Sequence, residues 1–428
     1  MNSFNKKSIT GIANSSLIKA SGVYSLASLL NSAIPFLLLP ILTHYLNPEE
    51  YGIISMFGLL QSIVGVFSGL SIYGAVQREY FHLNGNEYKE YVGNCIVILF
   101  LSTVLVTILI YLFSGFIEEI SSIKKDLFWI IILISFYQFV ILSLTSIYRA
   151  KMEAIKFSIF QIGLTIINVG LSILFVVALK LGYLGRIYAQ LIAYILIGTL
   201  ALIILIKNYS IIKINYEYIK RALSFGIPLI PHALGGFFIT MTGRLIISHE
   251  LGLEQAGLYA LGTQLGSIIG ILADSFNKAY SPWLYEKLNK NDNRIKRKIV
   301  KFTYLYFILI IVASVILGLS SPFVINIIAG KQYHNAYNVV MWIALGNAFN
   351  GMYFMVTNYI FYAYKTHILA IITIITGIIN IFLTFFMVKY MKLVGAALSF
   401  MIVNAISFIL TWYLSSRLYK MPWKIKEI

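Results

Sequence analysis

Charged residues are scarce in this sequence: they make up 11% of its 428 residues, whereas 59% of the residues are hydrophobic. Soluble domains carry about 25% charged residues, so this chain has too little polar surface to cover a water-exposed fold. Its mean hydropathy of +0.83 points the same way. We therefore expect an integral membrane protein whose main solvent is lipid.

Several signatures of chemistry are also missing. The single cysteine, Cys95, excludes an intramolecular disulfide framework and a metal site built from several cysteines. The six histidines show no HExxH spacing, and the sequence contains no GxxxxGK[ST] motif for nucleotide phosphates. We therefore expect no enzyme, no cofactor and no metal site. The net charge of +17 would suit nucleic acid, but no stretch between the apolar runs is long enough for a soluble binding domain.

Apolar runs of about 20 residues, the length that crosses a bilayer, recur along the chain. The twelve predicted spans are 20–45, 51–75, 94–115, 127–148, 157–179, 184–206, 224–248, 256–281, 302–328, 337–363, 368–389 and 393–415. The first run is too long for a signal peptide and lacks a cleavage site at its end, so we interpret it as a span. The predicted fold class is all-α, with about twelve transmembrane helices.

Lysine and arginine set the expected orientation of these spans. Alternate connecting segments contain 24 basic residues on one side and 7 on the other. Because basic residues accumulate in cytoplasmic segments, both termini are predicted to lie in the cytoplasm. The cluster Lys287–Lys301 belongs to the richer side, either as a topology anchor or as a contact for anionic lipid headgroups.

Short patterns recur in two halves of the chain. Leu46–Gly52 (LNPEEYG) and Leu251–Gly257 (LGLEQAG) follow spans one and seven, and Asn168 and Asn380 occupy spans five and eleven. Two six-span halves of equal orientation indicate a parallel duplication, with the substrate path expected between the halves. The predicted domains are an N-terminal six-helix bundle (1–206), a cytoplasmic linker (207–223) and a C-terminal six-helix bundle (224–428).

Three charged side chains lie inside the two apolar runs of the stretch from Phe225 to Tyr285, where a charge costs about 2.5–3.5 kcal/mol on insertion scales. Arg244 either meets an anionic substrate or extends to the outer interface. Asp274 and Lys278, four residues apart, form either a structural pair or part of a polar cavity in which the lysine meets phosphate and the aspartate carries a proton. Arg78 and Arg149 end spans two and four as anchors, or together surround an inward mouth.

Amide side chains also lie at span depth, where they either join helices or line a polar cavity. The cavity candidates are Asn31, Gln61, Gln161, Asn168, Gln264, Asn347, Asn350 and Asn380. Gln161 and Asn168 are seven residues apart and therefore share a helix face.

Four segments carry a resemblance to a known family. They are Leu46–Gly52, Phe225–Pro231 (FGIPLIP), Gly257–Leu261 (GLYAL) and Ser281–Tyr285 (SPWLY). In these segments, and in its length, span number and duplication, the chain resembles the polysaccharide flippases, or Wzx-type O-antigen translocases, of the multidrug/oligosaccharidyl-lipid/polysaccharide exporter superfamily. One departure is Gly243, which stands where many relatives have an acidic residue before an arginine.

The resemblance implies a MATE-like, V-shaped pair of six-helix bundles in the bacterial inner membrane. Such proteins move an undecaprenyl-diphosphate-linked oligosaccharide to the periplasmic leaflet by alternating access, and a polysaccharide polymerase and a chain-length regulator are implied as partners. On this basis Arg78, Arg149, Arg244 and Lys278 are candidates for binding the diphosphate, and Asp274 is the candidate for ion coupling.

Three alternatives stay open at this point. A multidrug/cation antiporter of the same superfamily should contain more intramembrane acids, and a lipid II flippase should line its cavity with more arginines. An envelope assembly scaffold that transports nothing should tolerate replacement of every intramembrane charge. The pattern also does not separate O-antigen from capsule or another exopolysaccharide.

Overall fold

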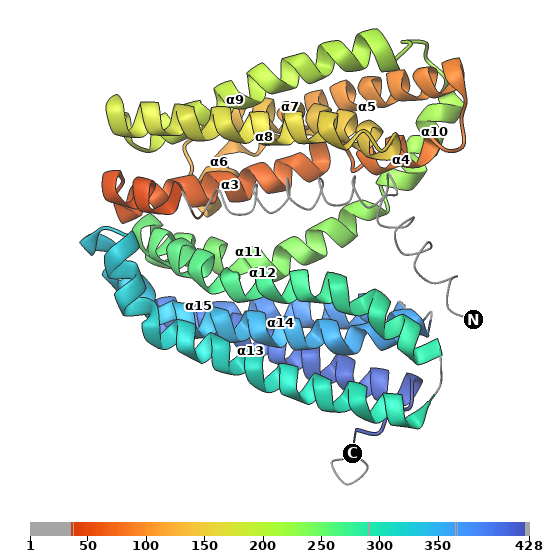
Figure 1. The fold of residues 1–428 in the computed structure, drawn as a ribbon. Coiled ribbons are helices and arrows are strands. Elements are labelled where there is room, and N and C mark those ends of the chain that lie inside the picture. Colours follow the sequence, from red (N-terminus) through yellow and green to blue (C-terminus); the bar gives the residue numbers. More distant parts are fainter. Residues whose placement is uncertain (1–35, 37, 290–291, 364, 366, 424–428) are drawn as a thin grey trace. The chain divides into compact units, whose positions relative to one another are not determined.

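The structure is a computed structural model that describes residues 36, 38–289, 292–363, 365 and 367–423. These residues form helices joined by short turns, and no β-strand occurs among them (Figure 1). In this described part, nine helices are long and apolar enough to cross a membrane. Helices suit this environment because they satisfy their backbone hydrogen bonds internally, without water.

The chain divides into two compact units. The N-terminal unit comprises Met1–Leu46 and Phe57–Leu234, and the C-terminal unit comprises Asn47–Met56 and Gly235–Ile428. The predicted limits of the two bundles and of the linker between them stay a prediction. Of the first predicted span, the structure describes residue 36 and residues 38–45, which are helical, and Asn31 lies outside the described residues.

The helices of the N-terminal unit pack around a core to which Tyr91 and Leu144 contribute fully buried side chains. Its long helices are α3 (Pro48–Ser68), whose first residues group with the other unit, α5 (Gly85–Leu112), α7 (Phe128–Ala150), α8 (Ala154–Ser172) and α9 (Gly182–Ile204). Shorter helices are α4 (Tyr73–Glu79), α6 (Ser114–Ser121) and α10 (Tyr216–Gly226), with a 3-10 turn, η1 (Lys125–Leu127). Single π-helical segments, η2 (Ile173–Ala178) and η3 (Leu205–Tyr209), extend α8 and α9.

The C-terminal unit contains most of α11 (Leu229–Leu251), together with α12 (Leu253–Asn289), α13 (Asn293–Ile328), η4 (Lys331–Ala336), α14 (Tyr337–Tyr362) and α15 (His367–Leu418). Its core is rich in aromatic rings: the ring centroids of Phe307 and Phe408 are 5.3 Å apart, and those of Phe408 and Trp412 are 5.4 Å apart. Asp292 caps α13 by accepting a hydrogen bond from the backbone N–H of Arg294 at 2.7 Å.

The predicted span 51–75 is wrong in being continuous. Helix α3 ends at Ser68. After Gly69, the residues Leu70 and Ser71 have φ angles of +48° and +56°. Two successive left-handed residues cannot continue a right-handed helix. The turn needs Gly69, because a Cβ there would overlap the ring of Phe139. The chain therefore turns before α4 begins.

Two other breaks involve the later spans. The predicted span 224–248 is divided between α10 and α11 at Pro228, whose ring and missing N–H disfavour a continuous helix. Lys392, with φ of +50°, is a non-helical residue inside α15. It lies between the predicted spans 368–389 and 393–415, so the single long helix contains the predicted break as a kink.

Candidate functional site

A buried carboxylate holds two arginines together in the N-terminal unit. Glu79, the last residue of α4, is fully buried. Its Oε1 accepts hydrogen bonds from Nε and Nη2 of Arg78 at 3.0 and 2.7 Å. Nη2 of Arg221, on α10, lies 2.7 Å from Oε2 as an ion pair. Burial of the carboxylate is tolerable because two charges compensate it. The three groups together carry one net positive charge.

Both arginines keep surface available to a ligand. The side chains of Arg78 and Arg221 are 45% and 42% exposed. Oε2 of Glu79 contacts Arg221 as an ion pair and accepts no aligned hydrogen bond from the described residues. The guanidinium carbon of Arg78 also lies 4.7 Å from the centre of the Phe225 ring, which fixes its plane.

The position of Arg221 depends on the segment that leads into α10. Asn94 of α5 donates from Nδ2 to the carbonyl of Lys213 at 2.9 Å, and its Oδ1 accepts from the backbone N–H of Asn215 at 2.9 Å. The side chain of Asn215 then caps α10 by accepting from the N–H of Glu217 at 3.0 Å. The amide of Asn94 thus ties α10 to α5.

The structure does not bring Arg149 into this cluster. Its Nη2 donates to Oγ of Ser146 at 3.0 Å, one turn earlier on α7. Its guanidinium carbon lies 5.8 Å from the centre of the Phe157 ring. Among the described residues it has no acidic partner.

Arg244 lies on α11 of the C-terminal unit with its Nε buried. No described residue forms a hydrogen bond with that Nε. The neighbouring Gly243 faces Tyr259 of α12, whose hydroxyl would be 2.8 Å from a Cβ at position 243. An acidic side chain at that position would therefore require Tyr259 to move, and the tyrosine takes up space that a carboxylate would otherwise need.

Asp274 and Lys278 form a close ion pair on α12. Nζ of Lys278 lies 2.6 Å from Oδ2 of Asp274, and the two side chains are 73% and 48% exposed, respectively. The spacing of four residues predicted this pairing. The high exposure means that the pair is not closed off by neighbouring side chains of the protein.

Three glutamines form a chain of hydrogen bonds in the N-terminal unit. Nε2 of Gln190, on α9, donates to Oε1 of Gln61 at 2.6 Å. Nε2 of Gln61, on α3, donates to Oε1 of Gln138, on α7, at 3.0 Å. Gln61 was predicted to line a polar cavity, whereas Gln138 and Gln190 were not. Three helices must meet before this chain exists, and no pattern within one helix predicts that meeting.

A second polar group in this unit involves Arg186, which the charge count assigned to an outer segment. Arg186 lies inside α9, and its Nη1 donates to Oδ1 of Asn168 at 2.6 Å and to Oγ of Ser172 at 3.1 Å. Arg186 and Gln190 are four residues apart and share a helix face, a signal that was visible in the sequence. The backbone carbonyl of Gln161 accepts from the hydroxyl of Thr165 at 2.9 Å.

The amides of the C-terminal unit mostly make local or interhelical bonds. Oε1 of Gln264 accepts from the hydroxyl of Tyr51 at 2.7 Å. Asn347 donates to the carbonyls of Gly266 and Ile343 at 3.3 and 3.0 Å. Asn380 is buried and accepts from the hydroxyl of Thr384 at 3.3 Å. Asn350 is partly buried on α14.

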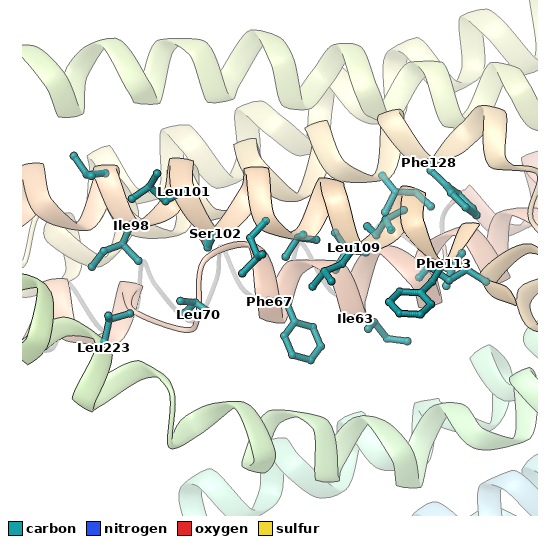
Figure 2. A pocket seen from close by; sticks show the side chains of 18 of the residues that line it. Ile63, Phe67, Leu70, Ile98, Leu101, Ser102, Leu109, Phe113, Phe128 and Leu223 are labelled. Carbon is teal, nitrogen blue, oxygen red and sulfur yellow. The ribbon is translucent and has the colours of Figure 1, made fainter. Parts of the chain in front are cut away.

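A large apolar cavity and a smaller cavity with polar side chains lie within the N-terminal unit. The larger, of about 610 Å³, is lined by apolar side chains of α3, α5, α6, α7 and α10, as Figure 2 shows for Phe67, Leu109 and Leu223. Its single polar side chain, Ser102, donates its hydroxyl to the backbone carbonyl of Ser68. This cavity can hold hydrocarbon, but it supplies no group that recognises sugar or phosphate.

The smaller cavity, of about 240 Å³, is polar. Its lining side chains come from α3, α4, α7 and the turn between α3 and α4, and half of its ten residues are the polar side chains of Gln61, Ser62, Ser71, Ser135 and Gln138, with Tyr73 beside them. No charged side chain of the described residues lines it. Elsewhere in the described part of the chain, no group of three His, Cys, Asp or Glu residues is placed to hold a metal ion.

Comparison with known proteins places these features in context. A family model described as "Polysaccharide biosynthesis protein" matches residues 17–287. A protein of Shigella flexneri described as a putative O-antigen transporter is 25% identical over 204 residues, which are 47% of this chain and 48% of that protein.

Two solved structures share the fold. One is an inward-facing multidrug resistance MATE family transporter of the MOP superfamily, with a TM-score of 0.74 and 14% identity, over 90% of this chain and 94% of that one. The other is the lipid II flippase MurJ in an inward closed conformation, with a TM-score of 0.72 and 18% identity, over 93% of this chain and 87% of that one. The predicted MATE-like, all-α membrane fold is thereby confirmed.

Proposed function

The chain belongs to the polysaccharide biosynthesis protein family, and on this premise we propose that it moves undecaprenyl-diphosphate-linked oligosaccharide from the cytoplasmic to the periplasmic leaflet of a bacterial inner membrane. At the family level it is a multi-pass membrane flippase for lipid-linked polysaccharide. The finer proposal adds the lipid carrier, the direction and alternating access as the mode of transport.

The observation that carries the proposal is the pair of arginines held on Glu79. A diphosphate carries several acceptor oxygens, and guanidinium groups bind such oxygens with paired, charge-assisted hydrogen bonds. Arg78 lies in the last turn of α4 and Arg221 lies within the predicted cytoplasmic linker, so both are on the side from which the substrate would arrive. Because Glu79 neutralises only one of the two charges, the site keeps a net attraction for an anion.

The other predicted residues have separate roles in this proposal. Arg244 offers a buried Nε in the C-terminal unit that needs an acceptor, and a phosphate oxygen would supply one. Arg149 and Lys278 are further cationic contacts for the diphosphate. Asp274 is the candidate for ion coupling, since its pairing with Lys278 allows a proton or a sodium ion to compete for the carboxylate.

The rival functions fit the same residues less well. A multidrug or cation antiporter needs several intramembrane carboxylates that a cation can reach, whereas Glu79 is shared by two arginines and Asp274 is paired with Lys278. A lipid II flippase differs in its sugar, and the cationic site alone does not discriminate between the two lipids. An envelope assembly scaffold has no use for a buried carboxylate that presents half-exposed arginines.

Complementation tests the proposal directly. Arg78→Ala, Arg244→Ala and Lys278→Ala proteins should fail to restore surface polysaccharide to a strain that lacks the flippase, while their amount in the membrane stays normal. Lys220→Ala is the matched control, because Lys220 is exposed on the same helix as Arg221 and forms no ion pair with a described residue. Full restoration by all three arginine and lysine variants would remove the cationic-site idea.

The orientation and surroundings are part of the same proposal. With both termini in the cytoplasm, Glu79 and its arginines lie at the inner face of the membrane. A polysaccharide polymerase and a chain-length regulator are the expected partners on the periplasmic side. Unpolymerised, carrier-linked repeat units should accumulate in the inner leaflet when the protein is absent.

A further inference from the structure

We propose that the 240 Å³ polar cavity of the N-terminal unit binds one sugar ring of the lipid-linked oligosaccharide, an inference that rests on the proposed function. Its wall is formed by α3, α7 and the turn that leads into α4. The residues that carry the argument are Gln61, Gln138, Ser62 and Tyr73, with Gln190 behind them.

The cavity exists because of the break after α3. The left-handed residues Leu70 and Ser71 turn the chain, so that Tyr73 returns to the wall formed by α3 and α7. The Tyr73 ring is held edge-to-face against Phe139, with centroids 6.2 Å apart. A continuous helix through this region would have carried the side chains of Ser71 and Tyr73 away from the wall.

The three glutamines leave a defined set of groups for a ligand. Oε1 of Gln61 and Oε1 of Gln138 are both used as acceptors inside the chain. One end of the chain therefore offers an NH₂ group at Gln138, for which the described residues supply no acceptor. If all three amides are reversed, the same end offers a carbonyl oxygen instead. In either case Gln138 supplies the cavity with one kind of hydrogen-bonding group, a donor in the first arrangement and an acceptor in the second.

The hydroxyls on the wall complete a surface suited to a neutral, hydroxyl-rich ligand. Ser62 donates its proton to the carbonyl of Gly58 at 2.8 Å, which leaves its oxygen free to accept. The Tyr73 hydroxyl forms no hydrogen bond with any described residue, and its side chain is 36% exposed. Sugar hydroxyls donate and accept together, so they match this mixture of donors and acceptors.

Two other ligands fit less well. A phosphate needs a cation, and no charged side chain among the described residues lines the cavity. A sodium ion is favoured by anionic oxygens, and the described lining contains no carboxylate. The volume is enough for several water molecules or for one hexose ring. Interhelical bonding alone explains Gln61 and Gln190, but it does not explain a hydroxyl-lined cavity beside them.

The test compares two lipids on the purified full-length protein in nanodiscs. One is undecaprenyl diphosphate, and the other is the same lipid carrying one hexosamine. We expect the sugar to tighten binding at least about tenfold in the wild type. Gln138→Leu, which keeps the side-chain volume, should abolish that tenfold gain and leave the affinity for the bare lipid unchanged. Tyr73→Phe should reduce the gain several-fold, and it keeps the ring that packs on Phe139.

Asn358→Leu provides the matched control. Asn358 is a buried amide that donates from Nδ2 to Oδ1 of Asn277, another amide, at 2.9 Å, and it lies on α14 and does not line this cavity. The control should keep both affinities at their wild-type values. If Gln138→Leu does not fold, Tyr73→Phe, at a partly exposed position, still measures the sugar-dependent gain.

Three results would overturn the proposal. A wild type that binds both lipids equally has no sugar site. Transport of these lipids would then depend on contacts to undecaprenyl diphosphate alone. Equal loss of both affinities in Gln138→Leu would show that the amide chain only holds the helices together. A sodium-dependent affinity that disappears in Gln138→Leu, with the sugar gain intact, would show a cation site. By contrast, a wild type that neither binds nor moves any undecaprenyl lipid would remove the proposed function itself.

Discussion

Gly52 of α3 and Gly257 of α12 face each other within the C-terminal unit. A Cβ on Gly52 would overlap the carbonyl oxygen of Leu253, and a Cβ on Gly257 would overlap the carbonyl oxygen of Pro48. The two glycines occupy equivalent places in the repeated segments 46–52 and 251–257. The repeats therefore meet through their backbones, and small residues are what allow membrane helices to approach so closely.

Substituting either glycine should destabilise the protein. Gly257→Ala must push apart two backbones, and overpacking of this kind costs about 1–3 kcal/mol. Gly58→Ala, on the same helix as Gly52, is the control, because apart from its own helix no described residue comes within 4 Å of its Cβ position. That change should be neutral or slightly stabilising, since alanine forms helices better than glycine.

Thermal unfolding with a thiol-reactive dye measures this effect. The single cysteine, Cys95, is buried and reports unfolding when it becomes reactive. An unchanged midpoint for Gly257→Ala, or an equal fall for Gly58→Ala, would contradict the close approach of the two helices.

The ion pairs of Glu79 predict that neutralising this carboxylate restores stability to a protein that lacks both arginines. Arg221→Ala leaves the buried carboxylate paired with Arg78, so its cost in stability should be modest. Arg78→Ala/Arg221→Ala leaves that carboxylate unpaired and should lose about 3 kcal/mol, more than the sum of the single changes. Adding Glu79→Gln to the double variant should recover most of the stability, because the unpaired charge is gone, but should not recover transport. Unfolding midpoints of the wild type, the two single variants, the double variant and the triple variant provide the comparison, and a triple variant no more stable than the double would disprove the electrostatic account.

The pair on α12 should matter for transport and not for stability. Both side chains are exposed, and exposed pairs four residues apart contribute about 0.3–0.5 kcal/mol. Asp274→Asn/Lys278→Met should therefore unfold at nearly the wild-type temperature. Lys278→Met alone should not restore surface polysaccharide, and Asp274→Asn should change the dependence of transport on pH or sodium. A transport profile identical to the wild type in both cases would return the pair to a structural role.

Site-directed labelling should establish the orientation of the chain. Arg294→Cys, at the start of α13, should react with an impermeant thiol reagent only when the cytoplasmic face is open to it. Lys331→Cys, after the other end of that helix, should react from the periplasm in intact cells. Both positions are exposed, and the buried Cys95 gives little background. Reaction of Arg294→Cys from outside would reverse the proposed topology.

Within a single helix, the sequence was a good guide to the site. The four-residue spacing of Asp274 and Lys278 predicted their ion pair, and the same spacing on α9 could have drawn attention to Arg186 and Gln190. The breaks were harder. Pro228 is a local signal for the break in the predicted span 224–248. The turn after α3 has no such signal, because Leu70 and Ser71 look like ordinary residues of an apolar run and only their packing reveals the left-handed backbone.

Composition and charge distribution alone determined that this chain is an all-α membrane protein with many spans. Lipid stabilises long apolar helices, and this stabilisation depends only on residues close together in sequence. The tertiary structure decided which distant side chains meet. Glu79 and Arg221 lie on separate helices, as do Gln61, Gln138 and Gln190, and each pairing requires helices from different parts of the chain to pack. Helical periodicity assigns a residue to a face, but the neighbour of that face is selected by packing across the whole unit, which no local pattern records.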